Sequence, residues 1–142
     1  TDEAIEQFAE YTWCKAEGHY VLAMPTADPG TVYLDVRENP YKSWDVIFHL
    51  PSPARAQILA TAMSLSAAFA WAEGWYCQRL KAPFNQTHRR DQVDRLKRPS
   101  ADDRRRLADY GIPVTDTTTR FMALTMLKII EDSPEMREAL IA

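Results

Sequence analysis

Residues 52–80 read SPARAQILATAMSLSAAFAWAEGWYCQRL, and this stretch dominates the fold that the sequence predicts. Ser52 is a favourable N-cap, and Pro53 suits the first position of a helix, where its missing N–H costs nothing. No charged residue lies between Arg55 and Glu73. A helix that is apolar over most of its circumference is usually buried, so we predict a long, buried central helix over residues 52–80. The apolar positions at three- and four-residue steps along it are Ile58, Ala62, Leu65, Phe69, Ala72, Tyr76 and Leu80.

The uncharged part of this stretch is too short and too polar for a membrane span. It covers residues 56–72 and includes Gln57 and Ser64, whereas a spanning helix needs about 20 mainly apolar residues. No basic start followed by an apolar run is visible, so we expect no signal peptide. The two cysteines, Cys14 and Cys77, form no metal or redox motif. We therefore expect a cytoplasmic protein with free thiols and no membrane contact.

Three short segments in the first third of the chain have the character of strands. Residues 31–37 (TVYLDVR) alternate apolar with polar side chains, and residues 19–24 (HYVLAM) and 44–50 (WDVIFHL) are apolar runs of strand length. Because consecutive strands joined by short loops usually pair, we predict a small antiparallel three-stranded sheet packed on the central helix. An amphipathic helix is expected over residues 2–16, before the sheet.

The composition changes after residue 80. Residues 81–100 are rich in charge and poor in large apolar side chains, which predicts a basic surface connection. Helical patterns follow over residues 102–110, after a cap at Thr115, and after Ser133 and Pro134. We therefore predict one α+β domain over residues 1–142. Its parts are a helix and sheet (1–50), the central helix (52–80), the basic connection (81–100) and the C-terminal helices (101–142).

Residue types that carry catalysis are few and scattered. His19, His49 and His88 lie far apart in the sequence, and none has the spacing of a metal ligand. Four acidic residues near the strand ends could meet in space as a catalytic pair, although solvation of loop ends explains them equally well: Asp28, Asp35, Glu38 and Asp45. No nucleophile elbow, phosphate-binding loop or dinucleotide fingerprint is present. We expect no enzymatic activity, no catalytic residue, no metal and no cofactor.

Positive charge is concentrated in one segment. Between Arg79 and Arg106 lie ten of the 17 Lys and Arg residues and four Asp, so this segment is about +6 within a chain of net charge −3. Such an asymmetry favours a polyanionic partner, and the arginine fork suits phosphate. The candidate nucleic-acid-binding residues are Arg89, Arg90, Arg95, Lys97, Arg98, Arg104 and Arg105. The competing interpretation is a solvated surface with helical i,i+4 pairs such as Asp102–Arg106.

The sequence thus predicts a non-enzymatic accessory or regulatory protein that contacts nucleic acid, DNA rather than RNA, through this basic segment. We expect it to act as a homodimer or within a complex. The alternative is a protein-interaction subunit without nucleic-acid contact, which would use Trp71, Trp75, Tyr76 and residues 136–140 as its contact surface. Salt dependence separates the two, because phosphate contacts weaken steeply with salt and apolar interfaces do not.

Overall fold

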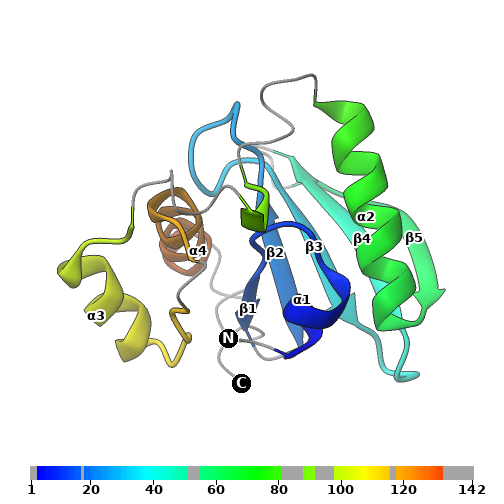
Figure 1. The fold of residues 1–142 in the computed structure, drawn as a ribbon, viewed down its shortest axis with the longest axis horizontal. Coiled ribbons are helices and arrows are strands. Elements are labelled where there is room, and N and C mark those ends of the chain that lie inside the picture. Colours follow the sequence, from blue (N-terminus) through cyan, green and yellow to red (C-terminus); the bar gives the residue numbers. More distant parts are fainter. Residues whose placement is uncertain are drawn as a thin grey trace.

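The computed structural model describes residues 3–16, 18–50, 55–80, 88–91, 98–115 and 118–132. Within them the chain has the predicted α+β class, with helices packed around a five-stranded antiparallel sheet rather than a three-stranded one (Figure 1). The strands are β1 (Cys14–Ala16), β2 (His19–Ala23), β3 (Tyr33–Glu38), β4 (Trp44–Leu50) and β5 (Arg55–Met63). The helices are α1 (Glu3–Phe8), α2 (Leu65–Arg79), α3 (Ala101–Asp109) and α4 (Arg120–Asp132).

The sheet is a meander in which each strand pairs with the next, in the order β1-β2-β3-β4-β5. The three strands predicted from the sequence are confirmed as β2, β3 and β4. Their register places His19 opposite Arg37 and Tyr33 opposite His49. Because directly opposite residues point to the same face of a sheet, the polar positions of these three strands share one face.

The prediction of one helix over residues 52–80 is wrong. Arg55–Met63 forms β5, which pairs with β4, and α2 begins only after Ser64, whose hydroxyl accepts a hydrogen bond from the amide of Ala67. An uncharged run has apolar residues at the spacing of a strand as well as at that of a helix. The first half of this run forms a strand because it pairs with β4. Ala62 has φ 58°, which interrupts the regular strand one residue before it ends at Met63. The predicted cap at Ser52 and Pro53 lies outside the described residues.

The prediction of a helix over residues 2–16 is also wrong in its second half. Helix α1 ends at Phe8, and Cys14–Ala16 is strand β1. The buried carboxylate of Glu73, on α2, accepts hydrogen bonds from the amides of Glu10 and Tyr11 and from Nε1 of Trp13, at 2.9–3.1 Å. These bonds occupy backbone donors that a longer helix would need, so residues 9–13 leave the helix.

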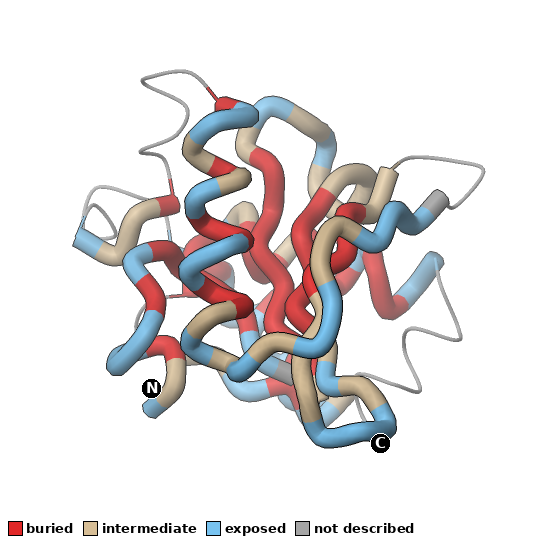
Figure 2. Tube along the Cα trace, turned by 90° about the vertical axis from the view of Figure 1, so that its right-hand side faces the viewer, coloured by how far each residue is buried: buried red, intermediate tan, exposed pale blue. Residues whose placement is uncertain are grey.

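One part of the core lies between α2 and a face of the sheet, and α4 adds six buried apolar residues. Phe69 packs edge-on against Tyr20 and Trp13, with ring centroids 4.9 and 5.2 Å apart, and Trp75 packs on Phe48 at 4.8 Å. Figure 2 shows buried residues running along both the strands and the inner side of the helices. Among the described residues, no helix combines the length and the apolar character that crossing a bilayer requires.

The helices predicted in the C-terminal half are confirmed where they fall within the described residues. Helix α3, capped by Ser100, packs on α4, and both lie on the side of β1 and β2, away from β5 (Figure 1). Thr119, not Thr115, caps α4, because its hydroxyl accepts from the amide of Met122 at 3.1 Å. The helix predicted after Ser133 and the contact surface predicted at residues 136–140 lie outside the described residues.

Candidate functional site

Arg89 and Arg90 are held against α1. Nη1 of Arg90 donates to the backbone carbonyls of Ile5, Glu6 and Ala9 at 3.0, 3.2 and 2.8 Å. These carbonyls lie in and just after the last turn of α1, and that of Ile5 also accepts from the amide of Ala9 at 3.0 Å, so the Arg90 guanidinium adds a cap to the C-terminal end of α1.

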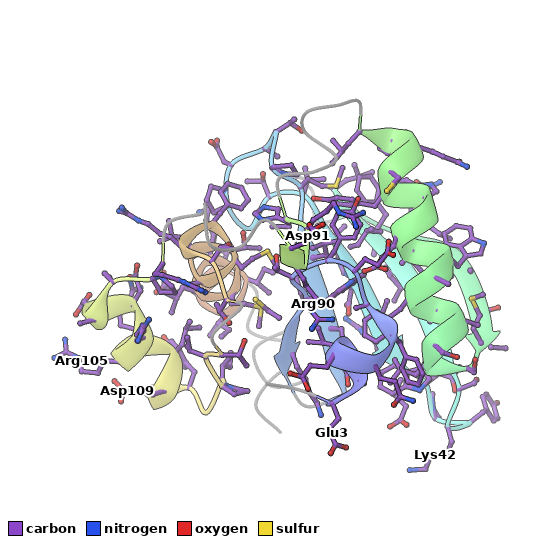
Figure 3. All side chains as sticks on the ribbon, viewed as in Figure 1. Glu3, Lys42, Arg90, Asp91, Arg105 and Asp109 are labelled. Carbon is purple, nitrogen blue, oxygen red and sulfur yellow. The ribbon has the colours of Figure 1, made fainter. Side chains whose placement is uncertain are left out.

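Arg89 is paired in a different way. Its guanidinium lies 5.7 Å from the centre of the Tyr11 ring and within 3.6 Å of Glu10 and 3.3 Å of Asp91. Both arginines therefore serve contacts within the chain. Figure 3 shows Arg90 and Asp91 near the middle of the molecule, far from Arg105 on α3.

The arginines of α3 lie among acidic residues of the same helix. Arg104 and Arg105 are exposed, and Arg105 pairs with Asp102 at 2.6 Å, while Arg106 pairs with Asp103 and with Glu131 of α4. The pairs within α3 have i,i+3 spacing, where the sequence suggested i,i+4. Because α3 holds three Asp and three Arg, its formal charge is zero. Arg98 is exposed just before α3, and Arg95 and Lys97 lie outside the described residues.

A buried ionic cluster occupies the polar face of β2, β3 and β4. The carboxylate of Asp35 is fully buried and lies 3.2 Å from Nδ1 of His19, 3.2 Å from Nε2 of His49 and 2.9 Å from Nη2 of Arg37. The His49 ring stacks on Tyr33 with centroids 4.4 Å apart. We call these five residues the Asp35 cluster. Its members come from three strands, so it depends on the sheet register.

Opposing effects set the charge state of Asp35. Burial alone raises the pKa of this carboxyl, because a charge is poorly solvated inside the protein. Hydrogen bonds from His19 and His49 and the charge of Arg37 outweigh burial and hold the pKa well below its ordinary range. The carboxylate is therefore ionised, and its acceptor sites are used within the sheet. Such a cluster can fix strand register, and the described residues include no group of three or more potential ligands that could hold a metal.

The other candidate groups lie apart from this cluster. His88 is buried against Phe121 of α4, with centroids 5.5 Å apart, and burial lowers its pKa to about 4. Asp45 accepts hydrogen bonds from Asn39 and from the amide of Ala62, so it supports a turn and the end of β5. Among the described residues, Asp35 lies against His19 and His49 and not against another carboxylate, so the possible catalytic pair of carboxylates is not seen.

The side of the molecule formed by β5 and α2 carries exposed residues without charge. Between Ala56 and Gln78 the sole charged residue is Glu73, and it is buried. Ile58 is 64% exposed and Trp71 37% exposed. Figure 2 faces this side of the molecule. We call it the uncharged surface, and its exposed members are Ala56, Gln57, Ile58, Thr61, Ala62, Ser64, Ser66, Ala70, Trp71, Gly74 and Gln78.

Two residues of the contact surface suggested by the sequence differ in position. Trp71 lies on the uncharged surface, but Tyr76 is fully buried, and its hydroxyl donates to the carbonyl of Ala23 at 3.0 Å.

Both cysteines are free. Burial raises the pKa of Cys14 to about 12, and Sγ of Cys77 lies 2.8 Å from the hydroxyl of Tyr11.

Comparisons with known proteins give no relative. No protein-family model matches the chain, and neither a curated protein nor a solved structure is significantly similar to it. The arguments about function therefore rest on the geometry above.

Proposed function

We propose that this chain is a non-enzymatic protein-interaction subunit that uses the uncharged surface of β5 and α2 as its contact surface. One observation carries the proposal: every exposed residue between Ala56 and Gln78 is uncharged, although the chain as a whole is 26% charged. Depletion of charge with aromatic residues at the centre is typical of protein interfaces. The cytoplasm is part of the same proposal, supported by the two free cysteines.

Nucleic-acid contact through the basic segment stays a second proposal. The exposed positions of Arg98, Arg104 and Arg105 support it. The internal contacts of Arg89 and Arg90 and the zero formal charge of α3 weigh against it. For this reason we place protein interaction first.

Native mass spectrometry of complexes purified from the protein's own cells tests the choice. We expect the tagged chain to carry a stoichiometric protein companion, a second copy included, identified by its mass. Trp71→Lys should remove this companion, whereas Tyr41→Lys should retain it, because Tyr41 is 89% exposed but lies in the turn between β3 and β4. Nucleic acid in place of a protein companion, released by high salt, would make the second proposal the correct one.

A further inference from the structure

His88 is held in the core without a hydrogen-bond partner for its ring. It is 1% exposed, and no described residue pairs with either of its buried ring nitrogens. The ring lies against Phe121 of α4, with centroids 5.5 Å apart. Most buried polar groups are hydrogen-bonded, so a neutral imidazole in this position is poorly accommodated, and a charged one would be accommodated still less well.

The backbone at His88 is paired with the chain between α1 and β1. The amide of Thr12 donates to the carbonyl of His88 at 2.7 Å, and the amide of Arg90 donates to the carbonyl of Glu10 at 2.8 Å. Opposite residues in such a pairing point to the same side. His88 therefore shares a side with Thr12, whose hydroxyl is also buried without a partner among the described residues.

The charged groups that adjoin His88 in this pairing are engaged elsewhere. The Arg90 guanidinium donates to carbonyls of α1, and Arg89 lies against Glu10 and Asp91. Neither arginine can accept a hydrogen bond from an imidazolium. The two carboxylates belong to exposed residues, whereas His88 is buried.

The neighbouring helices provide no buried counter-charge for His88 within the described part of the chain. The carboxylate of Glu73, on α2, is occupied by backbone amides and by Trp13. Burial is the one cause of the lowered pKa of His88, so a protonated ring would be an unpaired cation in the core. The charged residues of α1 and α4 are all exposed: Glu3, Glu6, Arg120, Lys128, Glu131 and Asp132.

We propose that His88 is a pH-sensitive latch, which on protonation releases residues 88–91 from residues 10–12, α1 and α4. An imidazolium carries a charge and two N–H donors, and water solvates it far better than this site does. When the ring leaves the core, the backbone bonds to Thr12 and Glu10 open, and Arg90 loses its contacts with α1. The latch lies outside the uncharged surface, so its test is independent of the proposed function.

The direction of the pH dependence follows from the two states of His88. A solvated histidine has a pKa of 6.5, whereas buried His88 has a pKa of about 4. The released form therefore binds the proton more tightly. The latched form is fully stable above about pH 6.5 and loses this stability as the pH falls toward 4. Between about pH 7.5 and 4.5 the equilibrium constant for release should rise about 70-fold.

Hydrogen exchange of the full chain, followed by NMR at these two pH values, tests the latch. The ratio of observed to intrinsic exchange rate at the amides of Thr12 and Arg90 measures release. It should rise about 70-fold in the parent. In His88→Phe, which keeps a ring against Phe121 but cannot be protonated, most of this rise should be lost. Titration of Glu73 contributes equally to both proteins, so the comparison isolates His88.

Two further variants separate titration from shape. His88→Gln cannot be protonated and differs in shape from His88→Phe, so it should lose the rise as well, even if one of the two packs poorly. His49→Gln is the matched control at a histidine of the Asp35 cluster, and it should keep the rise of the parent. An undiminished rise in both His88 variants, or a His88 ring that titrates near pH 6.5 in the folded protein, overturns the latch.

The same exchange data distinguish local release from unfolding of the whole chain. At about pH 4.5 the paired amides of β3 and β4 should exchange at least about tenfold more slowly, relative to their intrinsic rates, than those of Thr12 and Arg90. Equal ratios would show that the whole chain opens in one step, and the latch would then be wrong.

Discussion

The Asp35 cluster contains charge that is buried, whereas the uncharged surface is exposed and carries no charge. In the middle of the sheet a carboxylate is fully buried, yet it is matched by two histidines and an arginine at 2.9–3.2 Å. On the side of β5 and α2, the exposed residues between Ala56 and Gln78 carry no charge. A buried charge is tolerated because its partners replace water. An exposed surface without charge can lose its water on binding without such partners, and β5 and α2 are therefore the candidate contact region.

The largest expected effect concerns the Asp35 cluster. Asp35→Ala leaves the cations of Arg37 and of any protonated histidine without their anion, and breaking a buried ion pair costs about 3–5 kcal/mol. We expect the free energy of unfolding, measured by urea denaturation, to fall by that amount. Asp28→Ala is the control, because Asp28 is exposed in the loop after β2. Equal stability of the two variants would show that the cluster adds nothing to folding.

The same carboxylate predicts how stability depends on pH. The pKa of Asp35 lies below its ordinary value of 3.8 in the folded protein, so the folded state binds this proton less tightly than the unfolded state. The stabilisation is complete above the unfolded pKa and is lost as the pH falls toward the folded pKa. In urea denaturation between about pH 5 and 2, the free energy of unfolding should fall less steeply for Asp35→Asn than for the parent. Parallel curves would contradict the ionised state of Asp35.

Arg90 and Arg89 extend the comparison to the basic segment. Arg90→Ala removes the guanidinium hydrogen bonds to three carbonyls at the end of α1, and we expect a loss of about 1–3 kcal/mol in the free energy of unfolding. Arg89→Ala removes only partly exposed ion pairs and a ring contact, and should cost about 1 kcal/mol or less. Thermal and urea unfolding of the two variants measure the difference. If neither variant lost stability, both arginines would be available to a partner.

How far the sequence predicts this fold depends on the range of the contacts. Strand β4 is predicted at its observed bounds, because a short apolar run between turns suits only a strand. Residues 55–63 suit both periods, and the choice depends on pairing with β4. Likewise, residues 9–13 leave the helix because of Glu73, 60 positions away from Trp13. The spacing of apolar residues within one segment does not show which distant residues will contact it.

The candidate site was harder to predict than the fold. Tyr33, Asp35 and Arg37 alternate with apolar residues, which normally indicates a solvent-facing side of a strand. Their burial depends on His19 and His49 arriving from neighbouring strands in the correct register. The uncharged surface, by contrast, corresponds to the uncharged run between Arg55 and Glu73. Absence of charge predicts burial, but it is also typical of an interface.

The smallest expected effect tests whether the uncharged surface is open to solvent. Gly74 lies inside α2, and a Cβ built on it meets no heavy atom within 4 Å. Because glycine in a helix interior costs about 0.5–1 kcal/mol relative to alanine, Gly74→Ala should raise the free energy of unfolding by that amount. Urea denaturation measures it, at protein concentrations low enough that association does not contribute. Gly18→Ala is the matched control: its Cβ would also meet nothing within 4 Å, but its φ of 74° disfavours a side chain. This control should lose about 1–2 kcal/mol. If Gly74→Ala were destabilising too, another part of the chain would cover the outer side of α2, and the contrast between the buried cluster and an exposed, uncharged contact surface would fail.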